Sequence, residues 1–134
     1  MKLKITSIFL LALVASFTFM AFMPKADTYT VDLSKSSVTW EGKKFTGGHN
    51  GTVNLTSGSL GSNAKKLTEG SFVVNMTTNK DADKSANLEK HLKSEDFFGT
   101  EKFPTASFSI KKVTANGNNA NITGDLTIKG ITNS

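Results

Sequence analysis

The sequence predicts a mainly β protein, an antiparallel meander of short strands that curls into a barrel or sandwich and is interrupted once by a short helical insertion. Three observations carry this prediction. Apolar and polar residues alternate with a period of two in most segments, which is typical of strands with one wet face. Turn signals separate these segments at short intervals. The period changes once, near Leu88, where apolar residues stand four apart.

The expected strands lie on both sides of that insertion. Alternation predicts strands near residues 29–33, 38–41, 53–55 and 72–76, with the glycine-rich run 47–51 as a turn, 63–66 as a loop and 77–87 as a polar connection. Alternation resumes at 106–110 and 122–128, joined by the strong hairpin signal Asn116-Gly117-Asn118-Asn119. Gly124 on the apolar face leaves room for a neighbour, a bend or a ligand. One further segment begins after Ile128, and we expect the chain to lack C-terminal strands that would cover this edge.

The insertion, residues 88–104, is expected to be a helical plug between the two runs of strands. Leu88 and Leu92 stand four apart, as on one face of a helix. Ser94 is expected to cap a second short turn, with acidic residues in its first positions. Pro104 favours extended geometry for the residue before it and so predicts an immediate return to strand.

The first 26 residues have the pattern of a secretory signal peptide. A basic start is followed by an apolar run from Ile5 to Met23, and Ala26 is a suitable last residue before cleavage. The apolar run is also long enough for an uncleaved anchor helix. With cleavage, residues 27–134 form one domain without stable membrane insertion, and the general composition suggests a periplasmic or secreted protein of a bacterial cell envelope.

Composition excludes several classes of function. All 16 basic residues are lysine; removal of Lys2, Lys4 and Lys25 leaves 13 against 11 acidic residues, a net charge of +2. Without arginine, the planar fork that recognises phosphate and guanine is missing, so no nucleic-acid partner is expected. The chain has no cysteine, which excludes disulfides, thiol chemistry and a lipid-modified N-terminal cysteine. Stability must therefore come from a packed sheet.

Several motifs of the sequence keep a specific order and spacing: the segments 29–32 and 36–40, Gly48-His49-Asn50-Gly51, the block 88–108 with Asp96-Phe97-Phe98 and Phe103-Pro104, and residues 124–132. Together these motifs resemble the YceI-like family of lipid- or polyisoprenoid-binding exported proteins. The resemblance implies a lipocalin-like antiparallel barrel of eight strands, with an apolar lumen that holds an isoprenoid quinone or polyprenyl lipid. Members typically continue through further β structure, so we expect closure of the lumen to be the point at which this chain departs from the family.

The alternation and the resemblance together indicate which side chains would contact a lipid. They are apolar residues of the inward stripes and of the plug, namely Trp40, Val53, Phe72, Val74, Met76, Leu92, Phe97, Phe98, Phe108, Ile110, Leu126 and Ile128. The alternative is that these side chains fill the barrel, as in an envelope stress or protein-interaction module without a lipid. Phe97, Phe98 and Phe103 would either form a lid over the barrel or only anchor the plug to the sheet.

Polar candidates are few. His91 would hydrogen-bond a lipid head group, with Lys90 and Lys93 near it, or would be an ordinary surface histidine. An enzyme is not expected, because His49 and His91 lack metal-ligand spacing and there is no Gly-x-Ser-x-Gly motif. We therefore expect no catalytic residue, no metal site and no cofactor, with a homodimer left open. A metal-dependent enzyme would require His49 and His91 to converge with a carboxylate.

Overall fold

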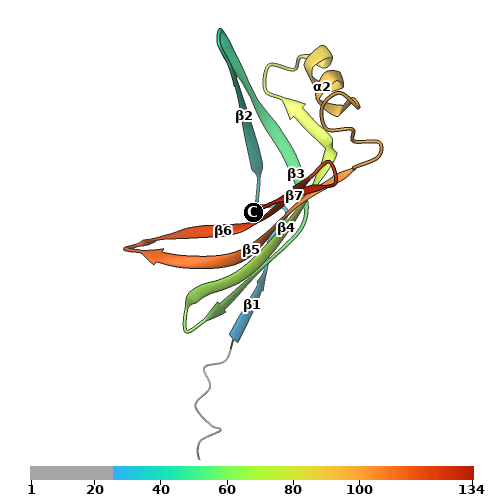
Figure 1. Cartoon of the computed structure of the whole chain (residues 1–134). Helices are drawn as coiled ribbons and strands as arrows, with labels where there is room; N and C mark the ends of the chain where they lie inside the picture. The colour runs from blue at the N-terminus through green and yellow to red at the C-terminus, as the bar shows by residue number, and fades with distance from the viewer. Residues whose placement is uncertain (1–25) are drawn as a thin grey trace, which may run out of the picture.

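The computed structural model describes residues 26–134, and these form one curved antiparallel sheet with a short helix at one end (Figure 1). Most of the predicted leader, residues 1–26, lies outside the described residues. The elements in chain order are β1 Ala26–Thr30, β2 Val38–Lys44, β3 Gly47–Asn63, β4 Lys66–Asp81, α2 Ala86–Lys93, β5 Thr105–Asn116, β6 Asn119–Ile128 and β7 Ile131–Asn133. Within residues 26–134, no helix has the length and apolar character needed to cross a membrane.

The sheet is an open, barrel-like wall. Its strand order is β1-β3-β4-β5-β6-β7, and β2 pairs with the first half of β3 while β1 pairs with the second half. Both β1 and β2 therefore lie along one edge and β7 along the other, and among the described strands no pairing joins the two edges. The predicted mainly β, lipocalin-like fold with a short helical insertion is confirmed, as a sheet that is not closed.

The long central strands give the sheet its curvature. Three register shifts interrupt the pairing of β3 with β4, at Thr52/Asn54, Leu55/Ser57 and Gly61/Ser62. Each such irregularity bends a strand and increases its twist. As a result, β2 and the first half of β3 stand away from β5 and β6, and the sheet has a concave side between them (Figure 1).

The turns between strands agree with the sequence in part. The loop expected at 63–66 is a two-residue turn in which Ala64 and Lys65 both have positive φ, and the Asn-Gly signal joins β5 to β6 with Gly117 at φ 59°. The glycine run 47–51 is a strand and not a turn, so that prediction was wrong. Gly51 is needed for close approach, because a Cβ there would lie 1.9 Å from the Lys80 carbonyl oxygen, whereas Gly47 has a positive φ of 92° directly after the turn at residues 45–46.

Two further strand boundaries differ from expectation. The strand predicted for 29–33 ends at Thr30, because the Asp32 side chain accepts a hydrogen bond from the Ser34 backbone N–H at 3.0 Å and turns the chain. The polar stretch after Met76 is not a connection at first, because β4 continues to Asp81. Its alternation was hidden by polar side chains on both faces.

The insertion is helical, but its caps differ from the prediction. Helix α2 begins after Ser85, whose hydroxyl oxygen accepts from the Leu88 N–H, and ends at Lys93. The expected second short turn is present at residues 95–98, where the Phe97 N–H donates to the Ser94 carbonyl oxygen. The Ser94 side chain does not cap this turn; its N–H and its hydroxyl both donate to the His91 carbonyl oxygen and end α2. The predicted strand follows Pro104 as β5.

Candidate functional site

A cavity of about 800 Å³ lies on the concave side of the sheet, lined mostly by apolar side chains. Beside it the buried apolar residues Val53, Met76 and Ala106 make a small core, against which Val38, Val74, Phe98 and Ile128 pack. Among the described residues no large side chain is fully buried. The side chains of this part of the chain therefore do not fill the concave side, and an apolar hollow remains.

The strand register explains how the predicted stripes meet in this hollow. On β4, Phe72 and Val74 stand two residues apart and share a face. They pair across to Phe108 and Ala106 of β5, and Phe108 in turn pairs with Leu126 of β6. Three neighbouring strands thus present one continuous apolar surface to the cavity.

Nearly all the residues predicted to contact a lipid line this cavity. They are Trp40, Val53, Phe72, Val74, Met76, Leu92, Phe97, Phe98, Phe108, Leu126 and Ile128. Ile110 is the exception: it is buried, but it lies beyond the lining, where its Cδ1 would be 2.9 Å from a Cβ at Gly70. Ile110 stands two residues from Phe108 on β5 and shares its face. It therefore lies farther along the strand than the cavity, where it and Leu60 cover Gly70.

Two glycines allow the aromatic rings to sit at the surface of the hollow. A Cβ at Gly58 would lie 2.9 Å from the Phe72 ring and 2.7 Å from Val31. A Cβ at Gly124 would lie 2.7 Å from the Phe108 ring. The space left by Gly124 is thus taken by a neighbouring ring, one of the three roles that the sequence left open for it.

The plug covers one end of the cavity. Leu92 is buried, and Leu92, Phe97 and Phe98 all line the hollow. The Phe97 and Phe98 rings contact edge to face with centroids 4.6 Å apart. Phe103 lies elsewhere, with its ring 2.8 Å from the position of a Cβ at Gly130. It fixes the turn between β6 and β7 to the plug, so of the three phenylalanines two face the cavity and one anchors.

His91 lies at the edge of this arrangement. Its side chain is exposed on α2 and its ring centroid is 5.8 Å from that of Phe97. His91 is not part of the cavity lining. Its contact with the lining is the ring of Phe97, whose side chain is itself 44% exposed.

Asn79 is a polar residue of the lining that the sequence did not reveal. It is only 3% exposed, and within residues 26–134 its Oδ1 atom has no hydrogen-bond partner. A buried polar atom without a partner is costly and calls for an explanation. The residue was assigned to a polar connection, because nothing in the pattern 77–87 showed that β4 continues and turns Asn79 inward.

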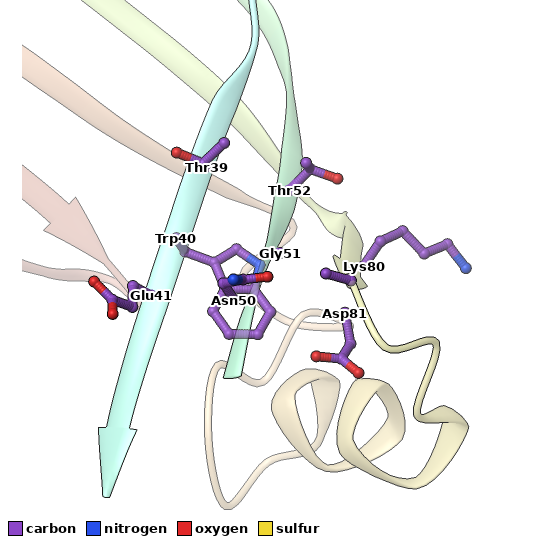
Figure 2. A pocket seen from close by; sticks show the side chains of 9 residues that line it. Thr39, Trp40, Glu41, Asn50, Gly51, Thr52, Lys80 and Asp81 are labelled. Carbon is purple, nitrogen blue, oxygen red and sulfur yellow. The ribbon is translucent and has the colours of Figure 1, made fainter. Parts of the chain in front are cut away.

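A second, more polar pocket of about 570 Å³ lies beside the first, between β2, β3 and the end of β4 (Figure 2). Trp40 and Glu41 line both pockets. The Trp40 indole lies over Gly51, where a Cβ would be 2.5 Å from the ring, and the Asp81 carboxylate lies next to the helix (Figure 2). Trp40 therefore stands between the apolar hollow and a polar corner.

A family model described as a YceI-like domain matches residues 29–134. The chain belongs to this family. A UPF0312 protein of Shewanella denitrificans is 40% identical over 83 residues, which is 61% of this chain and 44% of the relative. A UPF0312 protein of Pseudomonas aeruginosa is 39% identical over 82 residues, 61% of this chain and 43% of the relative. Protein YceI of Escherichia coli is 47% identical over 47 residues, 35% of this chain and 25% of the relative.

The matched part of this YceI-like chain thus spans less than half the length of these curated relatives. The YceI-like match includes every strand except the first residues of β1, together with the plug. The cavity, its aromatic lining and Asn79 all lie inside the matched residues.

Proposed function

We propose that this protein binds and carries, or sequesters, an amphipathic isoprenoid lipid of the quinone or polyprenyl type, without catalysing a reaction on it. The observation that carries the proposal is the apolar hollow of about 800 Å³ on the concave side of the sheet. Its size falls within the range of roughly 300 to 1,000 Å³ that is common for small-molecule sites. Family membership supports the proposal through the resemblance described above.

The chemistry of the lining suits a hydrocarbon tail. Burial of each CH₂-sized group of a tail stabilises a complex by about 0.8 kcal/mol, although the cost of ordering the tail removes part of this gain. A tail of several isoprene units would therefore bind through the Phe72, Val74 and Phe108 surface with few polar contacts. Selectivity would rest on tail length and shape.

Asn79 offers a polar head group a partner inside the cavity. Its buried side-chain oxygen has no partner among the described residues and would accept from a hydroxyl, as of a quinol or a polyprenol, while its amide nitrogen would donate to a quinone or phosphate oxygen. His91, the head-group candidate from the sequence, lies outside the lining. We therefore assign the head-group contact to Asn79 first and keep His91 as a contact at the rim beside Phe97.

The alternative, a filled-barrel interaction module, requires side chains to occupy the interior. The hollow and the absence of any fully buried large side chain among residues 26–134 favour a carrier over that alternative. The proposed location, periplasmic or secreted, rests on the leader-like residues 1–26 of the sequence.

The proposal is tested by titration with quinones of increasing isoprenoid tail length. Trp40 is the only tryptophan of the chain and lines the cavity, so quenching of its fluorescence reports a bound quinone. We expect saturable quenching whose affinity rises with tail length, and little quenching by the same head group without a tail. Equal, unsaturable quenching by all of them would reject the carrier proposal.

A second comparison tests the role of Asn79. In Asn79→Leu, affinity for a polyprenyl quinone should fall about tenfold, because one hydrogen bond to the head group is lost. Affinity for a tail of the same length without a head group should not fall. His91→Gln serves as the matched comparison. If affinity for the quinone falls in His91→Gln and not in Asn79→Leu, the head group contacts His91 at the rim and not Asn79.

A further inference from the structure

We propose that His49, Asp81 and Asp83 form a binding site for a divalent transition cation of the Zn²⁺ class. Each of the three residues offers one ligand atom, and these atoms lie within 4.8 Å of one another. The site is independent of the lipid proposal, because none of its three residues lines the apolar cavity. The spacing of the residues along the chain does not predict this site, because the metal arrangement that the sequence analysis describes joins His49 to His91.

The strand register and the turn that follows β4 bring the three residues together. Gly51 of β3 pairs with Asp81 of β4, and the Ala82 N–H donates to the Asn50 carbonyl oxygen at 2.9 Å. His49 and Gly51 stand two residues apart on β3 and share a face. The strand β4 ends at Asp81, and the Lys84 N–H donates to the Asp81 carbonyl oxygen at 3.1 Å, so Asp83 lies in a turn. This turn places a carboxylate oxygen of Asp83 within 4.8 Å of the ligand atoms of Asp81 and His49.

The buried ligand atoms are the observation that points to a cation. The Asp81 side chain has no exposed surface, and within the described residues its Oδ1 atom has no hydrogen-bond partner. The Nδ1 atom of His49 is likewise buried without a hydrogen-bond partner there, and lies 3.5 Å from Asp81 Oδ1. A buried carboxylate oxygen without a donor is unfavourable unless another charge compensates it.

The geometry and the atom types suit one class of ion. Two ligands bound to one Zn²⁺ at a tetrahedral angle lie roughly 3.3 Å apart, given bonds of about 2.0 to 2.1 Å. The separation of His49 Nδ1 from Asp81 Oδ1 is close to this value. One imidazole nitrogen with two carboxylates favours Zn²⁺ or a neighbouring first-row ion over Mg²⁺ and Ca²⁺, which prefer oxygen ligands only. Asp83 is exposed and can move onto the ion.

The surroundings already hold Asp81 in place. Its Oδ2 atom accepts from the Ser85 N–H at 3.0 Å, and its own N–H donates to Glu89 at 3.1 Å. Ser85 is the N-cap residue of α2, so a cation on Asp81 Oδ1 would connect the start of the plug helix to β3. The bound ion would thus fasten the helical end of the molecule to the sheet.

Zn²⁺ alone is the probe for the test, with the metal-free full chain followed by calorimetry, thermal unfolding and Trp40 fluorescence. We expect one equivalent of Zn²⁺ to bind, to raise the Tm and to change the emission of Trp40, which lies over Gly51 opposite Asp81. His49→Gln and Asp81→Asn should each weaken binding by roughly 100-fold or more, and Asp83→Asn by about tenfold. His91→Gln is the control and should bind Zn²⁺ as the unsubstituted chain does.

Asp81→Asn also separates a metal site from a plain ion pair. The amide oxygen can still accept from the Ser85 N–H, while the uncompensated buried charge is removed. We therefore expect the metal-free Tm of this variant to be equal or higher, with its Zn²⁺ response lost. His49 is one-third exposed and Asp83 is exposed, so their variants fold even if Asp81→Asn does not. Absence of saturable Zn²⁺ binding, or binding unchanged in His49→Gln and Asp83→Asn, would overturn the proposal and leave an ion pair only.

Discussion

Replacing Phe72 by aspartate places a carboxylate in the middle of the apolar surface that is proposed to hold the lipid tail. Phe72 lines the cavity, is partly buried, and stands opposite Phe108 in the pairing of β4 with β5. Its side chain faces the hollow and not the packed core of Val53, Met76 and Ala106. The fold should therefore tolerate the change, while the surface offered to a ligand becomes charged.

The size of the effect follows from two contributions. Full burial of a phenylalanine side chain is worth about 1.5 to 3 kcal/mol, and since Phe72 is already partly buried, its contact with a tail contributes about 1 kcal/mol. Covering a carboxylate with hydrocarbon costs at least about 2 kcal/mol more. The sum of about 3 kcal/mol corresponds to a loss of affinity of roughly 100-fold.

The assay is a titration with an isoprenoid quinone, followed by Trp40 quenching, on variants whose circular dichroism matches that of the unsubstituted chain. Phe72→Leu keeps an apolar surface and should lose less than about tenfold. Ser71→Asp carries the same charge on the adjacent, exposed residue of β4 outside the cavity lining, and should leave affinity unchanged. A folded Phe72→Asp protein that binds the quinone as tightly as Phe72→Leu would refute the assignment of this face.

Three further predictions concern stability. Gly51→Ala should lower the free energy of unfolding in urea by about 1 to 3 kcal/mol, because its Cβ would meet the Lys80 carbonyl oxygen and the Trp40 ring; an unchanged midpoint would be inconsistent with this packing. Leu92→Ala should cost about 2 kcal/mol in the same assay, near the low end for buried leucine because one side faces the cavity, and a cost near zero would mean that α2 is not packed on the sheet. Hydrogen bonds, first from Ser134 and then from Lys111, hold the pKa of the Asp125 carboxyl below its usual 3.8. The stability that Asp125 contributes is therefore present above pH 3.8 and is lost as the pH falls through the lower pKa of the folded state. Asp125→Asn should flatten this part of the pH profile of the free energy of unfolding, and a profile identical to that of the unsubstituted chain would contradict the prediction.

The sequence predicted the faces of the strands better than their lengths. Alternation placed Phe72, Val74 and Phe108 on one side, because side-chain direction in a strand depends only on the period of two. It did not show that β4 extends to Asp81, since Thr and Asn residues on both faces conceal the pattern. The glycines of the run 47–51 predict a turn although the run is a strand, because glycine serves both in turns and where another chain segment or a ring lies close, as Trp40 does over Gly51.

The sequence also predicted the apolar residues of the candidate sites better than the polar ones. Most of the apolar lining was predicted, because apolar stripes are visible in the sequence, although the smaller aliphatic residues Val31, Val38, Leu55, Leu60 and Ala106 were not named. Asn79 and the group of His49, Asp81 and Asp83 were missed, because each depends on register between β3 and β4 or on a strand end that polar residues obscure. Spacing along the chain carries no signal for side chains that meet only across a pair of strands.

The most direct measurement for the carrier account is native mass spectrometry of the protein isolated without detergent from the cells that make it, followed by solvent extraction of what accompanies it. The account predicts a discrete added mass, held at one molecule per chain, that extracts as an isoprenoid lipid and is absent from the Phe72→Asp variant. A bare protein mass that persists after incubation with quinones and polyprenyl lipids would contradict it.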